Sequence, residues 1–277
     1  MSRSIVAMDT FFQAPLRPID LKTRFEMMKQ AGFDAAYHSD WSAGAAQDEA
    51  RAQLRRVSEE ADLPVAAMYV KIDLAEGHDA ALSKAGHVLA DLPPGADLEV
   101  AVTFGPDRSA DDQLDSPEHD ERAIAFARAL GGLTDATVCL YPHVGFWMQK
   151  HATAARIAAA ADHERVRCMF CAYHWWAIDE HAELEATLES LAPHLHAINI
   201  CGVDGVGRGV AKIRPLDDGQ LDNATLLGQL FRRGFDGRVA IQGYSLRGDA
   251  FARLRHARAT CDEMIERVTA HPAWYGG

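Results

Sequence analysis

Short apolar segments alternate along the chain with longer amphipathic segments. The apolar segments are rich in β-branched and aromatic residues, which is typical of buried parallel strands. They begin near Ser4, Asp34, Leu63, Asp97, Thr137, Val166, Leu195 and Arg238. The intervening segments repeat apolar residues three and four positions apart, as helices on a sheet do, over 20–31, 45–61, 118–130, 150–161 and 180–191.

This strand–helix alternation predicts an α/β protein with one parallel sheet closed into a (β/α)8 barrel, a single TIM barrel spanning residues 1–277. A doubly wound open sheet is the alternative, but no G-x-G-x-x-G follows the first strand. Gly32, Gly234 and Gly237 fall at helix-to-strand joints, where a left-handed cap favours glycine. Long loops are expected over 106–122 and 202–222.

Composition narrows the class of partner. The formal net charge of −12 argues against nucleic acid and against an anionic membrane surface, which both require a basic patch. A small anionic ligand stays compatible, because a few cations can gather locally. No apolar stretch has the length of a signal peptide or a membrane span, and five scattered cysteines indicate reduced thiols. We therefore expect a cytoplasmic protein, and homo-oligomerisation stays open.

Cys168 and Cys171 form a C-x-x-C within a predicted strand. Residues three apart on a strand point to opposite faces, so this pair is not expected to share a metal or a disulfide.

The carboxyl ends of the strands carry the candidate chemistry, because active sites of such barrels lie there. Polar and aromatic side chains gather at these ends: Asp9, His38, Asp40, Trp41, Lys71, Tyr141, His143, His174, Trp175, Asn199, Gln242 and Tyr244. Four of the five tryptophans fall near a strand end. Aromatic rings cover the apolar C–H faces of sugars, which favours a carbohydrate-like small molecule as the ligand. Alternatively, these rings seal the barrel or a subunit contact.

Four segments resemble those of the xylose isomerase-like barrels, the sugar-phosphate isomerase/epimerase superfamily. They read LYPHVGFW, CAYHWW, LHAINICGVDG and IRPLDDGQLDNATLLGQLFRRGFDGRVAIQGY, in the order of that family's last four strands. The resemblance covers nearly the whole chain and is strongest from Thr137 onward. It implies the barrel fold and proton-transfer chemistry on a sugar.

The resemblance also implies that the family's metal site has been replaced. Tyr141 stands at the first ligand glutamate, Cys171 at the aspartate, Asn199 at the ligand histidine and Gln242 at the last glutamate. Divalent cations need charged oxygen and imidazole ligands, so this exchange is expected to abolish or weaken the site. Because the new residues are polar, we interpret the site as rebuilt for recognition of hydroxyl groups without a metal cofactor.

His143 and His174 are the predicted acid/base residues, since histidine titrates near neutrality. Lys71 is the third predicted catalytic residue, because a partly buried ammonium stabilises an enediolate. Structural hydrogen bonding by the histidines and solvation of Lys71 are the alternatives. The predicted substrate-binding residues are Tyr141, Asn199, Gln242, Tyr244, Trp175, Trp41 and His38.

Two further cations, Arg208 and Arg214, lie in the expected loop after the seventh strand. They could hold an anionic substrate group, or could belong to a charged surface loop.

Three functions compete. The leading hypothesis is a sugar isomerase or epimerase, or a lyase, that moves a proton without an obligatory metal. The second is a metal-dependent isomerase or lyase with a divalent metal at a displaced site of His38, Asp40, His143 and His174. The third is a carbohydrate-binding barrel without catalysis.

Overall fold

A computed structural model describes residues 3–13, 18–105, 113–178 and 184–275 of the chain. Eight parallel strands close into a barrel in the order β1, β10, β7, β6, β5, β4, β3, β2. The strands are β1 (Ile5–Met8), β2 (Ala35–Ser39), β3 (Val65–Asp73), β4 (Asp97–Thr103), β5 (Val138–Leu140), β6 (Val166–Cys171), β7 (Leu195–Ile200) and β10 (Arg238–Ile241). The predicted single (β/α)8 barrel is confirmed.

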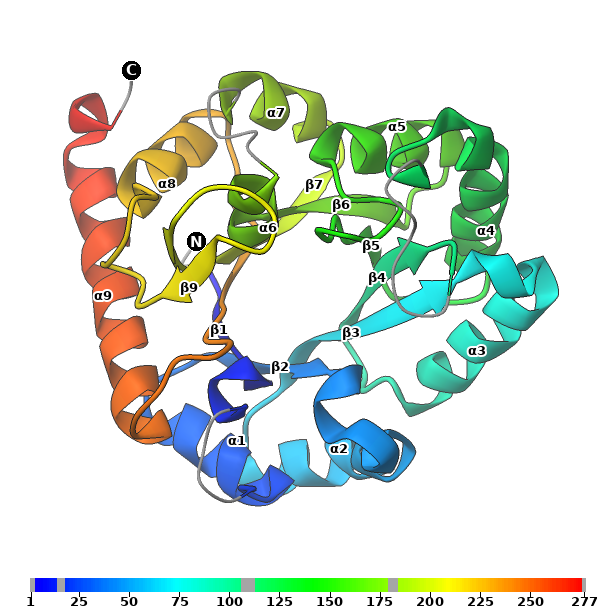
Figure 1. Ribbon diagram of the computed structural model, residues 1–277. Coiled ribbons are helices and arrows are strands. Elements are labelled where there is room, and N and C mark those ends of the chain that lie inside the picture. Colours follow the sequence, from blue (N-terminus) through cyan, green and yellow to red (C-terminus); the bar gives the residue numbers. More distant parts are fainter. Residues whose placement is uncertain (1–2, 14–17, 106–112, 179–183, 276–277) are drawn as a thin grey trace.

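Helices form an outer ring around the strands (Figure 1). They are α1 (Leu21–Gln30), α2 (Gln47–Ala61), α3 (His78–Asp91), α4 (Asp120–Gly132), α5 (His151–Ala161), α7 (Leu184–Leu191), α8 (Asn223–Arg232) and α9 (Ala250–Ala270). Among the residues described, none of the helices is long and apolar enough to cross a membrane. The cellular compartment stays a prediction.

The barrel separates two cores. The larger lies between the strands and the outer helices, and the smaller fills the barrel itself. The inner core contains three tyrosines, Tyr37, Tyr69 and Tyr141, each 5% exposed or less. Because these hydroxyl groups are buried, each needs a hydrogen-bond partner inside the barrel.

Two segments differ from the sequence-based expectation. The sixth apolar run continues through His174, but β6 ends at Cys171 and the chain turns into a short helix, α6 (Ala172–Ala177). The expected loop 202–222 contains a hairpin of β8 (Gly202–Asp204) and β9 (Lys212–Arg214). Figure 1 shows α6 and the yellow hairpin segment inside the ring of outer helices, over the barrel. Both changes bring polar side chains over the barrel opening.

The boundaries of two other predicted segments shift. The expected loop 106–122 ends in a short 3-10 turn, Pro117–His119, and α4 begins at Asp120. The predicted helix 180–191 is seen from Leu184. Residues 106–112 and 179–183 lie outside the described residues.

Glycine is required at the helix-to-strand joints for different structural reasons. Gly32 and Gly234 adopt φ values of 90° and 81°, as a left-handed cap requires. Gly237 does not, so its predicted role as a left-handed cap was wrong. A Cβ atom there would lie 2.1 Å from the backbone oxygen of His196, so the close approach to β7 excludes a side chain.

Cys168 and Cys171 lie on opposite faces of β6, in the outer and the inner core respectively. All five cysteines are buried free thiols. The expectation that the two residues of the C-x-x-C point to opposite faces of the strand is confirmed.

Candidate active site

A cavity of about 460 Å³ opens at the carboxyl ends of the strands. This volume is in the range of small-molecule sites. Seven predicted site residues line it: Trp41, Lys71, Tyr141, His143, His174, Gln242 and Tyr244. The structure therefore brings the three predicted catalytic side chains to one cavity, while their roles stay predictions.

The two histidines lie side by side and share a backbone partner. Their ring centroids are 4.1 Å apart. Nδ1 of His143 donates to the carbonyl oxygen of Val144 at 2.9 Å, since a carbonyl can only accept. The N–H of Val144 donates to Nδ1 of His174 at 3.3 Å. Val144, the residue after His143, thus fixes both ring tautomers when the rings are neutral.

Burial favours the neutral form of His174. The side chain is 3% exposed, and this desolvation lowers its pKa well below the ordinary value, with smaller contributions from His143 and His151. With Nδ1 accepting a hydrogen bond, the proton of the neutral ring lies on Nε2. His174 is therefore a neutral hydrogen-bond donor at neutral pH.

Lys71 is linked to His143 through an aromatic ring. Phe146 stacks on His143 with centroids 4.1 Å apart, and the Nζ atom of Lys71 lies 5.9 Å from the Phe146 ring centroid. The positive charge and the imidazole therefore line the same part of the cavity. Phe146 was missed from the sequence, because its place depends on the loop after β5.

The floor of the cavity is a neutral hydrogen-bonded cluster. Tyr69 and Tyr141 pack edge to face at 4.8 Å, and the amide of Asn199 donates to the Tyr141 hydroxyl at 3.4 Å. Asn199 lies 1% exposed beneath the cavity, and its Oδ1 atom has no hydrogen-bond partner among the described residues.

The mouth of the cavity carries two exposed aromatic rings. Trp41, after β2, and Tyr244, after β10, meet edge to face with centroids 5.8 Å apart, and each is 43% exposed. Gln242 lies below them, and its Oε1 atom is 4.0 Å from the Sγ atom of Cys201. Rings in this position can cover an apolar face of a ligand.

Two predicted substrate-binding residues lie away from the cavity. The ring of Trp175 is 1% exposed and packs on Phe170 behind α6, with centroids 5.7 Å apart. His38 is 2% exposed and pairs with Asp9, Nδ1 to Oδ2, at 3.1 Å. Its neighbours Tyr37 and Ser39 face the interior, so His38 faces the helices.

The displaced metal site is not assembled. His38 pairs with Asp9, and Asp40 forms a buried ion pair with Arg51 on α2. Neither side chain lines the cavity that contains His143 and His174. The four proposed ligands are separated because strand alternation directs His38 outward.

The four positions that the sequence resemblance aligns with the family's metal ligands also fit a metal poorly. Burial raises the pKa of the Tyr141 phenol and of the Cys171 thiol well above their ordinary values, so neither is expected to ionise at neutral pH. Asn199 and Gln242 are uncharged. A divalent cation would therefore find no anionic ligand among these four residues.

A different cluster of potential ligands lies at the amino ends of the strands. Among the described residues, Asp97, Cys139 and His196 bring their ligand atoms within 4.8 Å of one another. Asp97 already accepts from His196 at 3.0 Å and from Arg238 at 3.1 Å. The guanidinium beside Asp97 disfavours a cation there.

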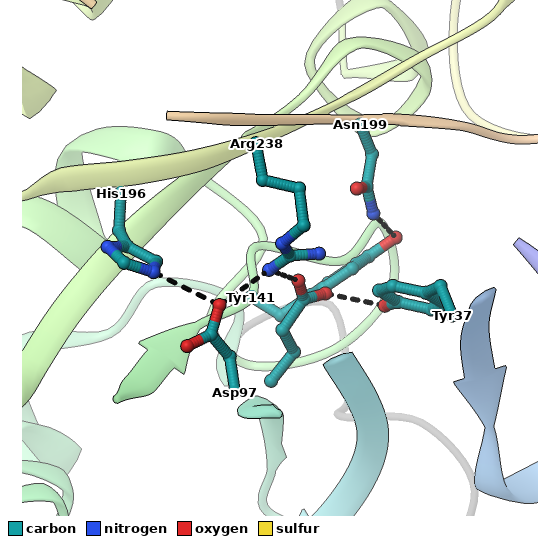
Figure 2. A network of polar contacts seen from close by, with 7 residues as sticks. Tyr37, Asp97, Tyr141, His196, Asn199 and Arg238 are labelled. Atoms are coloured by element: carbon teal, nitrogen blue, oxygen red, sulfur yellow. Dashed lines mark hydrogen bonds and ion pairs between the residues drawn. The ribbon is translucent and has the colours of Figure 1, made fainter. Parts of the chain in front are cut away.

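Figure 2 shows Arg238 at the centre of this second network, with Asp97 and His196 on one side and Tyr37 on the other. Arg238 also donates to Glu99 at 2.7 Å, and the Tyr37 hydroxyl donates to Glu99 at 2.5 Å. These contacts pair the carboxylates of Asp97 and Glu99 with a buried cation, and we interpret the network as structural.

The comparisons place the chain in a family. The family described as xylose isomerase-like TIM barrel matches residues 25–264, so the chain belongs to it. The predicted resemblance is confirmed. No curated protein matches the chain in sequence.

Solved structures share the fold at low identity. An L-ribulose 3-epimerase is 16% identical with a TM-score of 0.76, over 100% of this chain and 99% of that one. A 3-keto-D-glucoside 4-epimerase from E. coli is 18% identical with a TM-score of 0.72, over 95% and 100%. A xylose isomerase-like barrel from Mycobacterium smegmatis, in complex with magnesium, is 14% identical with a TM-score of 0.69, over 95% and 96%.

Proposed function

We propose that this protein is a sugar isomerase/epimerase-like enzyme that moves a proton on an aldose or keto-sugar without a metal cofactor. Membership of the family and the sugar epimerases among its structural neighbours support the substrate class. The observation that carries the reaction is the pair of histidines fixed by Val144 at the cavity.

His143 is the proposed base. Its Nδ1 proton is held by the Val144 carbonyl, which leaves the lone pair of the neutral ring on Nε2. This atom takes the proton from the carbon next to the substrate carbonyl. For an aldose–ketose interconversion the resulting imidazolium returns the proton to the former carbonyl carbon, and the hydroxyl proton of the deprotonated carbon passes to the former carbonyl oxygen, so that no other reagent is consumed.

His174 is the proposed hydrogen-bond donor. A neutral imidazole with its proton on Nε2 can donate to the substrate oxygen on which negative charge develops. Its lowered pKa makes it a poor base. The two histidines therefore have different roles rather than interchangeable ones.

Lys71 supplies the positive charge for the enediolate oxygen, and Gln242 offers amide groups to substrate hydroxyls. Trp41 and Tyr244 cover the ring or chain of the sugar at the mouth. Asn199 acts from below by fixing the hydroxyl of Tyr141.

We propose a metal-free reaction because the side chains at the expected ligand positions are uncharged. The four positions that the sequence resemblance aligns with the family's metal ligands carry a phenol, a thiol and two amides, and burial disfavours the anionic forms of the first two. The positive charge that a metal would supply to the intermediate comes from Lys71.

The experiment is an exchange screen in D2O. Aldoses and ketoses are incubated with the protein in EDTA, and loss of the proton next to the carbonyl is followed by 1H NMR. Exchange that is retained in His256→Gln, an exposed histidine paired with Asp217, and lost in His143→Gln supports the proposal.

Other results of the screen contradict it. Exchange that requires added Mg²⁺ or Mn²⁺ would indicate a metal-dependent isomerase. Tight binding of a sugar without exchange or product would indicate a carbohydrate-binding barrel.

A further inference from the structure

The interconversion of an aldose and a ketose moves two protons, one between carbons and one between oxygens. In the proposed function His143 carries the first. The second leaves the hydroxyl of the deprotonated carbon and reaches the former carbonyl oxygen. The group that carries it must donate a proton to one oxygen and accept a proton from the other, so it needs both a proton and a lone pair at the substrate.

The cations and the buried imidazole of the cavity meet only half of this requirement. Lys71 and Arg208 line the cavity, but an ammonium or a guanidinium donates hydrogen bonds and has no lone pair. The Nδ1 lone pair of His174 accepts from the Val144 N–H, so the neutral ring offers only its Nε2 proton. A hydroxyl group, in contrast, donates and accepts at a single atom.

Several hydroxyl groups of the cavity are badly placed for this transfer. Thr10 follows β1 and Ser39 ends β2, which lie four and three places from β5 in the closed order of strands, whereas His143 follows β5. The hydroxyl of Tyr173 donates to a carbonyl of the hairpin at 3.2 Å. Tyr244 is exposed at the mouth. These positions favour a hydroxyl closer to the end of β5.

Tyr141 lies beside both histidines. It follows β5 directly, and its backbone N–H donates to the carbonyl of Val100 on β4 at 2.9 Å, so the barrel itself fixes its position. Its ring centroid is 5.5 Å from that of His174 and 6.2 Å from that of His143. A substrate carbonyl bound between the two imidazoles would therefore lie next to this phenol.

Asn199, on β7, sets the hydroxyl of Tyr141. Its Nδ2 atom donates to the hydroxyl oxygen at 3.4 Å, as Figure 2 shows. A hydroxyl has one proton and two lone pairs, so this bond occupies one lone pair and keeps the proton and the other lone pair for the substrate. Burial raises the pKa of the Tyr141 phenol well above its ordinary value. The phenol therefore gives and takes the proton together, without a separate phenolate.

We propose that Tyr141 relays the hydroxyl proton between the two oxygens of the substrate, with Asn199 as its positioning residue. This rests on the proposed function and names the group that completes it. The relay is needed for isomerisation, because an epimerisation removes and returns a proton at one carbon and moves no hydroxyl proton.

The relay balances the reaction. When His143 removes the carbon-bound proton, the C–H electron pair forms the C=C bond of the enediolate and the carbonyl π pair moves to its oxygen. That oxygen takes the proton of Tyr141, and the Tyr141 oxygen takes the proton of the neighbouring hydroxyl. The imidazolium then protonates the former carbonyl carbon, and the oxygen that lost its proton becomes the new carbonyl. Both side chains end as they began.

The test compares proton exchange with isomerisation in the same sample. D-fructose, D-glucose and D-mannose share one enediolate, and D-xylulose, D-xylose and D-lyxose share another. Exchange next to the carbonyl of the ketose needs removal and return of a proton by His143, whereas formation of an aldose also needs the relay. Both rates are measured by 1H NMR in D2O with EDTA, starting from each ketose.

Tyr141→Phe should lower the rate of aldose formation by about 10²-fold or more and the rate of exchange by about 10-fold or less, so their ratio changes by about 10-fold or more. Asn199→Leu should change the ratio in the same direction, and the double variant should match Tyr141→Phe, because Asn199 acts through the phenol. Tyr69→Phe removes the neighbouring phenol of the cavity floor and should keep the wild-type ratio.

An unchanged ratio in Tyr141→Phe would overturn the relay and indicate a structural role for the phenol. A ratio that changes in Tyr69→Phe instead would assign the relay to the wrong residue. Absence of exchange by wild type on both ketoses would contradict the proposed function and the relay together. Exchange by wild type without aldose formation, as in an epimerase, would contradict only the relay.

Discussion

His143 and His174 are held by the same residue in opposite senses: the Val144 carbonyl accepts from one ring, and the Val144 N–H donates to the other. The rings lie 4.1 Å apart at the cavity wall. This arrangement assigns the proton of each neutral ring, so it predicts that the two histidines respond differently to the same substitution.

Substitution of the two histidines should lower the rate of proton exchange to different extents. His143→Gln should lower the rate of proton exchange by about 10²- to 10⁴-fold, because glutamine has no basic nitrogen. His174→Gln should lower it less, because the glutamine amide can still donate a hydrogen bond. Rates are measured by 1H NMR in D2O beside His256→Gln. Equal losses in the two cavity variants would contradict the division of roles.

Stability should depend on pH through His174. Its pKa in the folded protein lies well below 6.5, chiefly because of burial, so the unfolded chain binds the extra proton as the pH falls. The contribution to the free energy of unfolding is complete above the unfolded pKa of about 6.5 and is lost toward the folded pKa. Urea unfolding between pH 7.5 and 5.5 measures this loss.

His174→Gln removes this titration. The wild-type free energy of unfolding should therefore fall relative to that of the variant, by at most about 1.4 kcal/mol per pH unit. Parallel pH dependences of the two proteins would show that His174 is not held neutral by burial. His256→Gln, exposed at the surface, should instead follow wild type.

Metal content tests whether Tyr141, Cys171, Asn199 and Gln242 have replaced the family's metal ligands, as the sequence resemblance implies. Protein purified without an affinity tag should contain zinc, manganese, iron and cobalt well below stoichiometry by plasma mass spectrometry. A chelator should leave the melting temperature unchanged, because Tyr141 and Cys171 stay protonated in the buried floor. Near-stoichiometric metal, with lower stability in the chelator, would contradict this reading.

The network at the other end of the barrel should dominate stability. Arg238→Met leaves the carboxylates of Asp97 and Glu99 buried without their cation, at a cost of about 3–5 kcal/mol. Arg165→Met removes an exposed pair with Asp135 and should cost about 1 kcal/mol or less. Chemical denaturation measures both, and similar costs would contradict a structural role for Arg238.

The barrel was predictable because parallel strands buried on both faces give continuous apolar runs. The end of β6 was not, since the residues after Cys171 are mostly apolar and suit either a strand or a helix. In the structure the helical segment makes hydrogen bonds with the hairpin through Tyr173 and Trp176, and these contacts leave no local signal in the sequence.

Part of the site was predictable from the sequence, because active-site residues of barrels lie at the ends of the strands. The strand ends predict most of the cavity residues, but strand alternation excludes His38 from them. Tyr37 and Ser39 face inward, so His38 had to face the helices. The roles of Val144 and Phe146 depend on the fold of the loop after β5, which leaves no periodic signal in the sequence.

Proton exchange by metal-depleted protein tests the central claim most directly. Wild type and His143→Gln are dialysed against EDTA, checked for residual metal and incubated in D2O with the sugar that exchanges fastest. We expect full exchange by wild type and strongly reduced exchange by His143→Gln. Exchange that disappears with the metal and returns when a divalent cation is added would contradict it.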